Sequence, residues 1–399
     1  MAQLISRHET LRTSFVLVDS KPVQRIQSHV EMDIFKNEVD ESEIPRLAAE
    51  FLQAFPMDRA PLMRMGLIRL EPERHLLMFD IHHIISDGIS MKNMVREFME
   101  LYSDLELPAL NIQYKDYSMW QNSAAMQRKL ISNEAFWLEQ FTPIPEAMNL
   151  PLDFPRPEEQ DNNGGIYLFQ CGSTESEVLR NLCNIETATM FMVLLAICNI
   201  LFSKLCGQED ITIGSVVAGR PHADLEHVMG VFVNTVAMRH FPKGDLSYRQ
   251  FLAQLKERHL KIIQHQDYMF EDLVAKVVTG RALGRNPLFD VAFGVQDIHI
   301  PGLQLPGLSL KPYVIDEAVS KFDICWYCTD DGNCINYSIE YRRRLFKPET
   351  IERFAEYFNE ITRMVVRNPD IRLKDIVIFH DLFDLELDMI VQDGKNFGF

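Results

Sequence analysis

Residues 76–88, LLMFDIHHIISDG, contain the pattern around which the rest of the sequence is organised. An apolar run typical of a strand ends in His82 and His83, and Asp87 and Gly88 follow after three further residues. Successive side chains of a strand point to opposite faces, so the two histidines cannot both enter one cleft if the strand continues through His82. We therefore predict a structural role for one histidine. The chemical role is assigned to His83, which lies where the strand gives way to a turn.

Asp87 and Gly88 open a predicted helix over residues 89–105. Its apolar positions repeat at helical spacing: Met91, Met94, Val95, Phe98 and Tyr102. A carboxylate at a helix start can simply cap free N–H groups, and this is the alternative to a chemical role for Asp87. An imidazole is suited to proton transfer near neutral pH. The alternative for His83 is a buried histidine with satisfied hydrogen bonds.

Composition limits the classes of partner. The 399 residues suggest two or three units of ordinary domain size, and the 47% apolar content is ample for real cores. The formal charge of −17 argues against nucleic acid or an anionic membrane as a partner, because both favour a basic surface. The opening residues, MAQLISRHETLR, lack the apolar segment of a signal peptide, so we expect a cytoplasmic protein.

The seven cysteines are an odd number and are scattered, which is typical of reduced thiols. Cys325-Trp-Tyr-Cys328 resembles a redox or metal motif, but it lies in a strand-like run where positions three apart face opposite ways. No second pair follows it. Structural thiols are therefore favoured over a metal site.

Residues 142–165 are rich in proline, acidic residues, asparagine and glycine, and this composition predicts a linker. It separates an N-terminal lobe, residues 1–141, which carries the histidine motif, from a C-terminal lobe, residues 166–399. Strands and helices alternate in both parts, which predicts two α/β lobes with mixed sheets. The chain opens on what resembles the last turn of a helix, so we expect the first lobe to be truncated at its start.

Several local predictions accompany this division. A hairpin is expected over TSFVLVDSKPVQRIQ, residues 13–27, with its turn at residues 19–21. The most apolar run, Met190 to Phe202, is too short to span a bilayer and is interpreted as a buried helix. The stretch GVFVNTVAMRH, residues 230–240, is predicted to be one strand. His259 lies on the apolar stripe of a helix, where a core role is favoured.

With these residues in view, the sequence resembles the condensation domains of nonribosomal peptide synthetases, and the likeness is not confined to HHIISDG. Other motifs of that family are matched in order along the chain by RHETLRTSF (7–15), YKDYSMW (114–120), MGVFVNTVAMR (229–239), HQDYMFE (265–271) and GRNPLFDVAF (284–293). VAGRPHADLE (217–226) and SKFD (320–323) are also family-like.

The resemblance implies two chloramphenicol-acetyltransferase-like lobes forming a V-shaped pseudo-dimer. It also implies amide-bond formation between a donor acyl or peptidyl thioester and an acceptor aminoacyl thioester, in the biosynthesis of an antibiotic or similar product. Both substrates arrive on phosphopantetheine arms of an upstream donor and a downstream acceptor carrier protein. No cofactor or metal of the chain's own is expected, and the chain is expected to be monomeric or part of a larger synthetase.

For the site, the resemblance implies that His83 takes the proton of the attacking amine or orients that amine by accepting a hydrogen bond. His82, Asp87 and Gly88 complete the predicted catalytic motif. In the family the aspartate pairs with an arginine that shapes the site. The candidates here are Arg239, then Arg12, and Asn234 is a further site-shaping residue.

Some features depart from the family or leave alternatives open. The family's first motif is absent, and Ala282 follows Arg281 where an acidic residue is usual. A stand-alone acyltransferase using a soluble thioester is one alternative, and an inactive scaffold that docks carrier proteins is another. An epimerisation domain also carries HHxxxDG, but residues 229–239 fit condensation better. Residues 342–344, three arginines, are a candidate docking patch or a solvated charge run.

Overall fold

The computed structural model describes residues 1–159, 161–278, 280, 284–296, 304–305, 307–311, 313 and 319–378. The chain forms two compact units, each discontinuous in sequence. The first comprises Met1–Ser132, Val217–Asn234 and Ile300–Asp316, and the second comprises the rest. Two later segments thus group with the first unit, and residues 142–165 lie within the range of the second.

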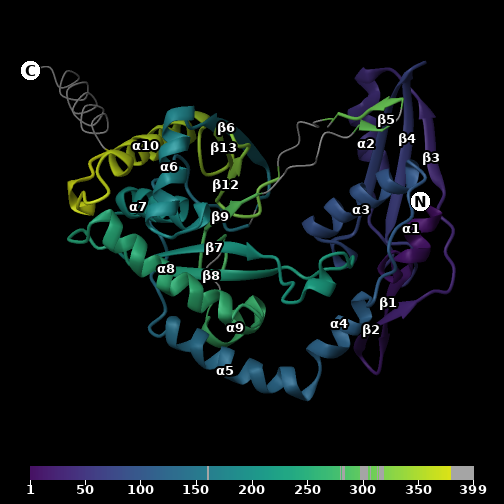
Figure 1. Ribbon diagram of the computed structural model, residues 1–399, viewed down its shortest axis with the longest axis horizontal. Helices are drawn as coiled ribbons and strands as arrows, with labels where there is room; N and C mark the ends of the chain where they lie inside the picture. Colours follow the sequence, from purple (N-terminus) through teal and green to yellow (C-terminus); the bar gives the residue numbers. More distant parts are fainter. Residues whose placement is uncertain are drawn as a thin grey trace, which may run out of the picture. The chain divides into compact units, whose positions relative to one another are not determined.

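The first unit combines short helices with small sheets, which Figure 1 shows in sequence colours. Its described elements are α1 (Ala2–Arg7), η1 (Glu9–Arg12), β1 (Thr13–Val18), β2 (Lys21–Ile26), β3 (Ile34–Glu38), η2 (Glu41–Glu43), α2 (Ile44–Phe51), β4 (Met63–Glu71), β5 (Arg74–Ile81), η3 (His83–Ile85), α3 (Gly88–Tyr102), α4 (Tyr114–Gln121), η4 (Ala223–Leu225), β10 (Gln304–Leu305) and β11 (Leu308–Ser309). Helix α5 (Ala124–Gln140) crosses the boundary between the units at Ser132.

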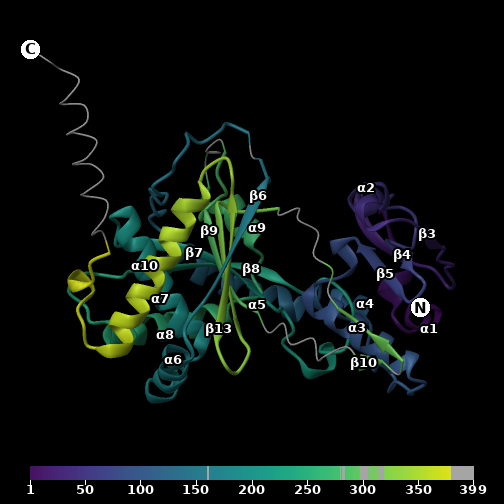
Figure 2. The same ribbon diagram turned by 90° about the horizontal axis from the view of Figure 1, so that it is seen from above.

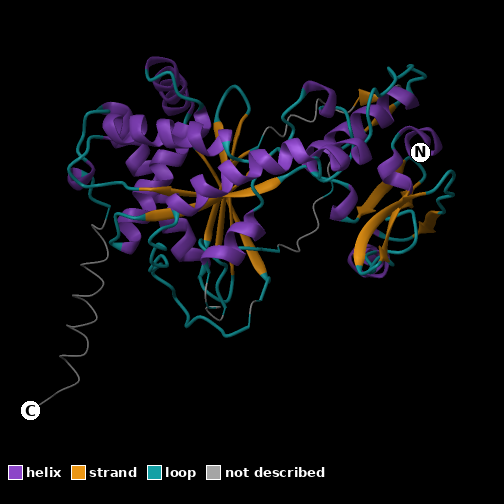
Figure 3. Ribbon diagram, turned by 90° about the horizontal axis from the view of Figure 1, so that it is seen from below, coloured by secondary structure: helices purple, strands orange, loops and turns teal. Residues whose placement is uncertain are grey.

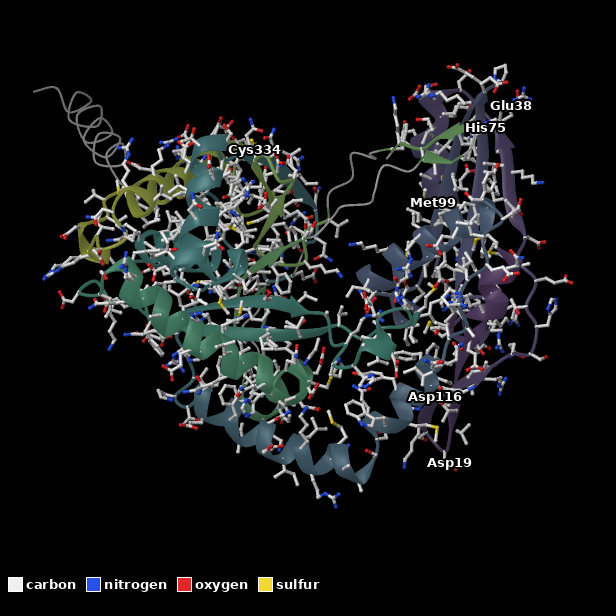
Figure 4. The ribbon with its side chains drawn as sticks, viewed as in Figure 1. Asp19, Glu38, His75, Met99, Asp116 and Cys334 are labelled. Atoms are coloured by element: carbon white, nitrogen blue, oxygen red, sulfur yellow. The ribbon has the colours of Figure 1, made fainter. Side chains whose placement is uncertain are left out.

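The sheet order in this unit is β3-β4-β5, with β3 parallel and β5 antiparallel to β4. Separately, β1 and β2 form the predicted hairpin, and Figure 4 labels Asp19 at its tip. Val18 pairs with Lys21, so the turn residues are Asp19 and Ser20, both with positive φ. Two positive φ values match the turn to the twist of the strands.

The core of the first unit contains helix, strand and motif residues together. Its fully buried members include Leu4, Leu11, Leu62, Ile85, Met94 and Met229. Ile85 comes from the turn after the histidines, and Met94 from the apolar stripe of α3. Met229 comes from the later segment 217–234, so this segment is part of the unit's core.

The second unit is built on one mixed sheet, drawn in orange in Figure 3. The strand order is β6-β13-β12-β9-β7-β8; β12 and β7 are parallel to β9, whereas β13 is antiparallel to β12 and β6. Its elements are β6 (Gly164–Gln170), α6 (Ser173–Ile185), α7 (Met190–Cys206), β7 (Ile211–Val217), β8 (Asn234–His240), α8 (Tyr248–Gln264), α9 (Phe270–Val277), β9 (Val291–Val295), β12 (Ile324–Asp330), β13 (Ile335–Arg342), α10 (Pro348–Arg367) and η5 (Leu373–Asp375).

Helix α7 is the predicted buried helix, with Val193–Phe202 almost entirely enclosed. It packs against α6, α8 and α10 (Figure 2). In the described part of the chain no single helix is both long and apolar enough to cross a membrane, although α6 and α7, bent at 108°, satisfy the length and composition criteria as a pair. The mixed α/β character predicted for both parts is confirmed.

The prediction of one strand over 230–240 is wrong in its first half. Strand β8 begins at Asn234, and residues 230–233 leave the sheet. The backbone amide of Gly230 donates to Ser90 Oγ and that of Phe232 donates to Asp87 Oδ2. These donors are therefore used in the first unit and are not available to a strand ladder.

Candidate functional site around the histidine motif

The histidine motif follows directly from strand β5. The strand ends at Ile81, and the amide of His82 still donates to the carbonyl of Leu62, 3.0 Å away. The chain then makes the short turn η3, in which Ile85 N donates to His82 O at 3.1 Å. Ile85 is fully buried and attaches the turn to the core, whereas His83 at the start of the turn is exposed.

The two histidines lie in different surroundings. The imidazole Nδ1 of His82 accepts from the amide of Ile84 at 3.1 Å, and its ring meets the Phe55 ring edge-on at 6.1 Å. The side chain of His83 is exposed, and within the described residues its imidazole makes no hydrogen bond or ion pair. His82 is therefore engaged locally, whereas the ring of His83 is free to meet a substrate.

Asp87 is buried and fully engaged. It is the N-cap of α3, where Oδ1 accepts from the amide of Ser90 at 2.8 Å, and Oδ2 accepts from the amide of Phe232 at 3.0 Å. Oδ1 also accepts from Nη2 of Arg220 at 3.0 Å. The capping role that the sequence left open is therefore present, and the carboxylate is an anchor enclosed away from solvent. At Gly88 an added Cβ would meet nothing within 4 Å, so the space beside the helix start is open.

Arg220 is the arginine that pairs with the motif aspartate. Its side chain is 5% exposed. Its guanidinium lies 4.0 Å from the centre of the Phe232 ring and donates to the carbonyls of Leu225 and Val228 as well as to Asp87. Burial lowers the pKa of Arg220, and the charge of Asp87 opposes that effect. A buried guanidinium with this many acceptors fixes geometry more than it adds stability.

The predicted pairing of Asp87 with Arg239 or Arg12 is wrong. Arg239, 8% exposed, forms a two-bond pair with Asp210 at 2.7 and 2.9 Å. That contact lies in the second unit. Arg12 donates to the carbonyl of Gln27 and approaches Glu9 at 3.6 Å. Both arginines are therefore used elsewhere.

Arg220 was missed although a signal was present. It stands in the family-like stretch VAGRPHADLE, which contains a single arginine. It lies 133 residues from Asp87 along the chain, so no local pattern links the two. Of the other site-shaping candidates, Asn234 is 8% exposed and is the first residue of β8.

Aromatic residues of α4 support this arrangement from one side. Tyr114 donates to the carbonyl of Val231 at 2.9 Å, and its ring packs edge-on against Phe232 at 5.1 Å. A Cβ on Gly230 would lie 2.1 Å from the Tyr114 ring, so only glycine allows this approach. The helix start is fixed by Asp116, labelled in Figure 4, whose Oδ2 accepts from Gln113 N at 2.8 Å.

The remaining sequence candidates lie outside the histidine motif. Arg342 is 3% exposed and pairs with Asp323, Arg343 donates to the carbonyl of Gly164, and Arg344 pairs with Asp161. Arg342 is buried whereas Arg343 and Arg344 are exposed, so the three arginines do not form one exposed run, and the choice between a docking patch and a solvated charge run stays open. Cys325 and Cys328 are buried free thiols. In the part of the chain that the structure describes, no group of histidine, cysteine or acidic side chains is arranged to hold a metal ion.

Comparison with known proteins decides the family. Residues 1–387 match the family model of the condensation domain. The chain is 41% identical over 374 residues to tyrocidine synthase 3 of Brevibacillus parabrevis, which covers 94% of this chain and 6% of that protein. The chain belongs to the condensation-domain family. The resemblance predicted from the motifs is confirmed, and members of this family form amide bonds in nonribosomal peptide synthesis.

Further relatives place this condensation domain in context. It is 39% identical to surfactin synthase subunit 1 of Bacillus subtilis (strain 168), covering 93% of this chain and 10% of that protein. The chain thus spans between 6% and 10% of these two curated relatives. The solved condensation domain from the monacolin K polyketide synthase has a TM-score of 0.81 at 18% identity, covering 93% of this chain and 89% of the other. That identity shows the shared fold alone.

Proposed function

We propose that this chain joins a donor acyl or peptidyl thioester to an acceptor aminoacyl thioester, with both substrates held on the phosphopantetheine arms of carrier proteins. The single observation that carries the proposal is the contrast within HHIISDG, between an exposed His83 and an enclosed Asp87. The family relationship supports the class of reaction. The chain spans only 6% to 10% of tyrocidine synthase 3 and surfactin synthase subunit 1, so the carrier-borne substrates are a proposal for this chain.

The reaction requires the protein to hold the two thioesters in contact and to assist the loss of one proton from the amine. The acceptor's neutral amine attacks the donor's thioester carbon, the C–N bond forms and the C–S bond breaks. The amine loses one proton, and the departing thiolate gains one. A ring nitrogen of His83 is proposed to accept that proton or to orient the amine through a hydrogen bond. Holding two reactants in contact supplies the larger part of such a rate enhancement.

The geometry gives each motif residue a proposed place in this scheme. His83 meets the amine, and His82 shapes the turn through its bond from Ile84 N. Asp87 holds the start of α3, and the open space at Gly88 leaves room for a bulky thioester. The predicted division into lobes at residues 142–165 also stays a proposal.

Loading two carrier proteins and following the acceptor-bound product by mass spectrometry tests the reaction. We expect the wild-type chain to form the amide, and His83→Ala to lower the rate about 100-fold or more. His29→Ala is the matched control, because the side chain of His29 is 80% exposed and lies outside the motif. Carrier-protein binding by the His83→Ala variant is expected to persist.

The same experiment separates the alternatives. Transfer from a soluble coenzyme A thioester at the carrier-bound rate would support a stand-alone acyltransferase. If the wild-type chain binds the carrier proteins but forms no amide, the docking scaffold is supported, whereas an unchanged rate in His83→Ala would exclude the proposed role of His83.

A further inference from the structure

One face of helix α3 is used to hold a segment that is distant in sequence. Asp87, Ser90 and Asn93 recur every third residue, so they lie along one side of the helix. Each contacts the segment 217–234: Asp87 through Arg220 and Phe232, Ser90 through Gly230, and Asn93 through the carbonyl of Glu226 at 2.6 Å. We call this row of three side chains the α3 polar stripe.

Ser90 is the centre of the stripe and is completely buried. Its hydroxyl donates to the carbonyl of Gly230 at 2.9 Å, and it accepts from the amide of Gly230 and from Nη2 of Arg220, both at 3.0 Å. A serine hydroxyl has one donor and two acceptor positions, so every position is filled. This single oxygen therefore joins α3, Gly230 and Arg220.

The same contacts reach the histidine turn. The amide of Ser90 donates to Oδ1 of Asp87, which is also the oxygen that Arg220 contacts. Asp87 directly follows Ser86, whose amide donates to the carbonyl of His83 at 3.2 Å. The turn that displays His83 is thus held at Ile85 by the core and at Asp87 by the network that Ser90 completes.

We infer that Ser90 is a positioning residue: its hydroxyl locks Gly230 and Arg220 onto the start of α3, and this sets the position of the turn that displays His83. The inference rests on the proposed function for its kinetic consequence, but the position of the turn is a structural property. Removing the hydroxyl leaves the amide and carbonyl of Gly230 and one Arg220 donor without their partner, so the segment shifts against the helix.

The fold itself is expected to survive that change. Met229 is fully buried, and its carbonyl accepts from Thr10 Oγ1 at 2.7 Å. Asp87 keeps its own bonds to Arg220 and to the amide of Phe232. Segment 217–234 therefore remains attached when Ser90 loses its oxygen, and the effect is a small displacement.

Ser90→Ala tests this, with Ser103→Ala as the matched control at the other end of the same helix. A displacement of about 1 Å can lower a rate up to about 100-fold, so we expect kcat for amide formation to fall by about 10- to 100-fold in Ser90→Ala. The KM for each carrier-bound substrate is expected to stay within about threefold, because substrate docking does not use this buried oxygen. Ser103→Ala should match the wild type in both constants.

A second measurement does not depend on activity. In protein labelled at histidine ¹³Cε1, the His83 resonance, assigned by its loss in His83→Gln, is expected to move in Ser90→Ala and to stay in place in Ser103→Ala. A fall in kcat without movement of this resonance, or movement without a fall in kcat, would overturn the inference. If the wild-type chain forms no amide, the proposed function fails, and the resonance alone decides the role of Ser90.

Discussion

Two buried clusters, one in each unit, have the same chemistry and different surroundings. In the first unit Asp87 pairs with Arg220, and in the second unit Asp323 pairs with Arg156 at 3.0 Å and with Arg342 at 3.3 Å. Both carboxylates are fully buried, and in both clusters at least one arginine comes from a distant part of the chain.

The difference lies in what adjoins each pair. Asp87 caps a helix and directly follows a turn whose exposed member is His83. Asp323 is near a second carboxylate, Asp290, which pairs with Arg285 at 2.8 Å. Burial is the largest cause that raises the pKa of Asp290 to about 6, and the charge of Asp323 adds to it. The comparison teaches that a buried ion pair between motif residues does not by itself identify a reaction site, and the exposed imidazole beside Asp87 is the feature that the second cluster is not observed to share within the described residues.

Arg220→Met gives the largest expected effect, because it breaks the pair in the unit that carries His83. Removing one partner of a buried pair leaves an uncompensated charge, so the free energy of unfolding should fall by about 3–5 kcal/mol. Transfer should also fall by more than about 100-fold, since the start of α3 is no longer fixed. Denaturant unfolding and the carrier-protein assay measure the two effects. Arg46→Met, whose side chain is 62% exposed, should change the unfolding free energy by less than about 1 kcal/mol.

Asp323→Asn should lower the free energy of unfolding about as much as Arg220→Met does, but it should leave the transfer rate nearly unchanged. The two arginines beside it lose their counter-charge, so we again expect a loss of about 3 kcal/mol in the free energy of unfolding. The rate per folded molecule should stay within about twofold of the wild type, because this cluster belongs to the second unit and His83 to the first. If Asp323→Asn lost as much rate as Arg220→Met, the claim that only the cluster of the first unit affects transfer would be wrong.

The pH dependence of stability sharpens the comparison further. The folded-state pKa of Asp290 is about 6, above its ordinary value of 3.8, so the folded state binds more protons than the unfolded state between these values. Asp290 therefore contributes stability below pH 3.8 that is lost as the pH rises through 6, by at most about 3 kcal/mol.

Asp290→Asn should remove this slope. The measurement is the difference in unfolding free energy between wild type and variant from pH 4 to pH 7. A constant difference across that range would show that the buried carboxyl does not retain its proton. Because the cluster lies away from His83 in sequence and in a different unit, the pH profile of transfer should not change with this variant.

Asn93→Ala is the smallest expected effect. It removes one side-chain donor to the carbonyl of Glu226 and leaves Asp87, Ser90 and Arg220 in place. The expected loss is about 1 kcal/mol in unfolding free energy. Its effect on kcat should be smaller than that of Ser90→Ala. A larger effect would show that Asn93, and not Ser90, is the most important residue of the α3 polar stripe.

Local patterns in the sequence predicted local structure well. The apolar spacing of residues 91–102 predicted α3, and the run from Met190 predicted the buried α7. The hairpin turn was predicted at residues 19–21 and lies at Asp19 and Ser20, because Lys21 already pairs with Val18. In each case the deciding information lies within a few residues, as side-chain periodicity or turn chemistry. The distinction between the two adjacent histidines came from the same kind of reasoning.

What the sequence did not predict depends on contacts between distant residues. GVFV was interpreted as strand because its residues have strand propensity, but the donors of Gly230 and Phe232 are taken by Ser90 and Asp87. Arg239 was the first candidate because it ends a recognised motif, but motif membership does not show which acidic side chain lies nearby, and Asp87 pairs with Arg220. Tertiary hydrogen bonding overrode propensity at both places.

The late arrival of residues 217–234 has a consequence for biosynthesis. Residues 1–132 leave the ribosome long before Met229 and Arg220, yet the core of the first unit contains Met229 and the charge of Asp87 needs Arg220. Until then the nascent chain has an open apolar site and an unpaired carboxylate, so it cannot reach its final state. The first unit to be translated is thus completed only after β7 of the second has been made, and ribosome pausing near residue 216 should prolong exposure to chaperones and proteases.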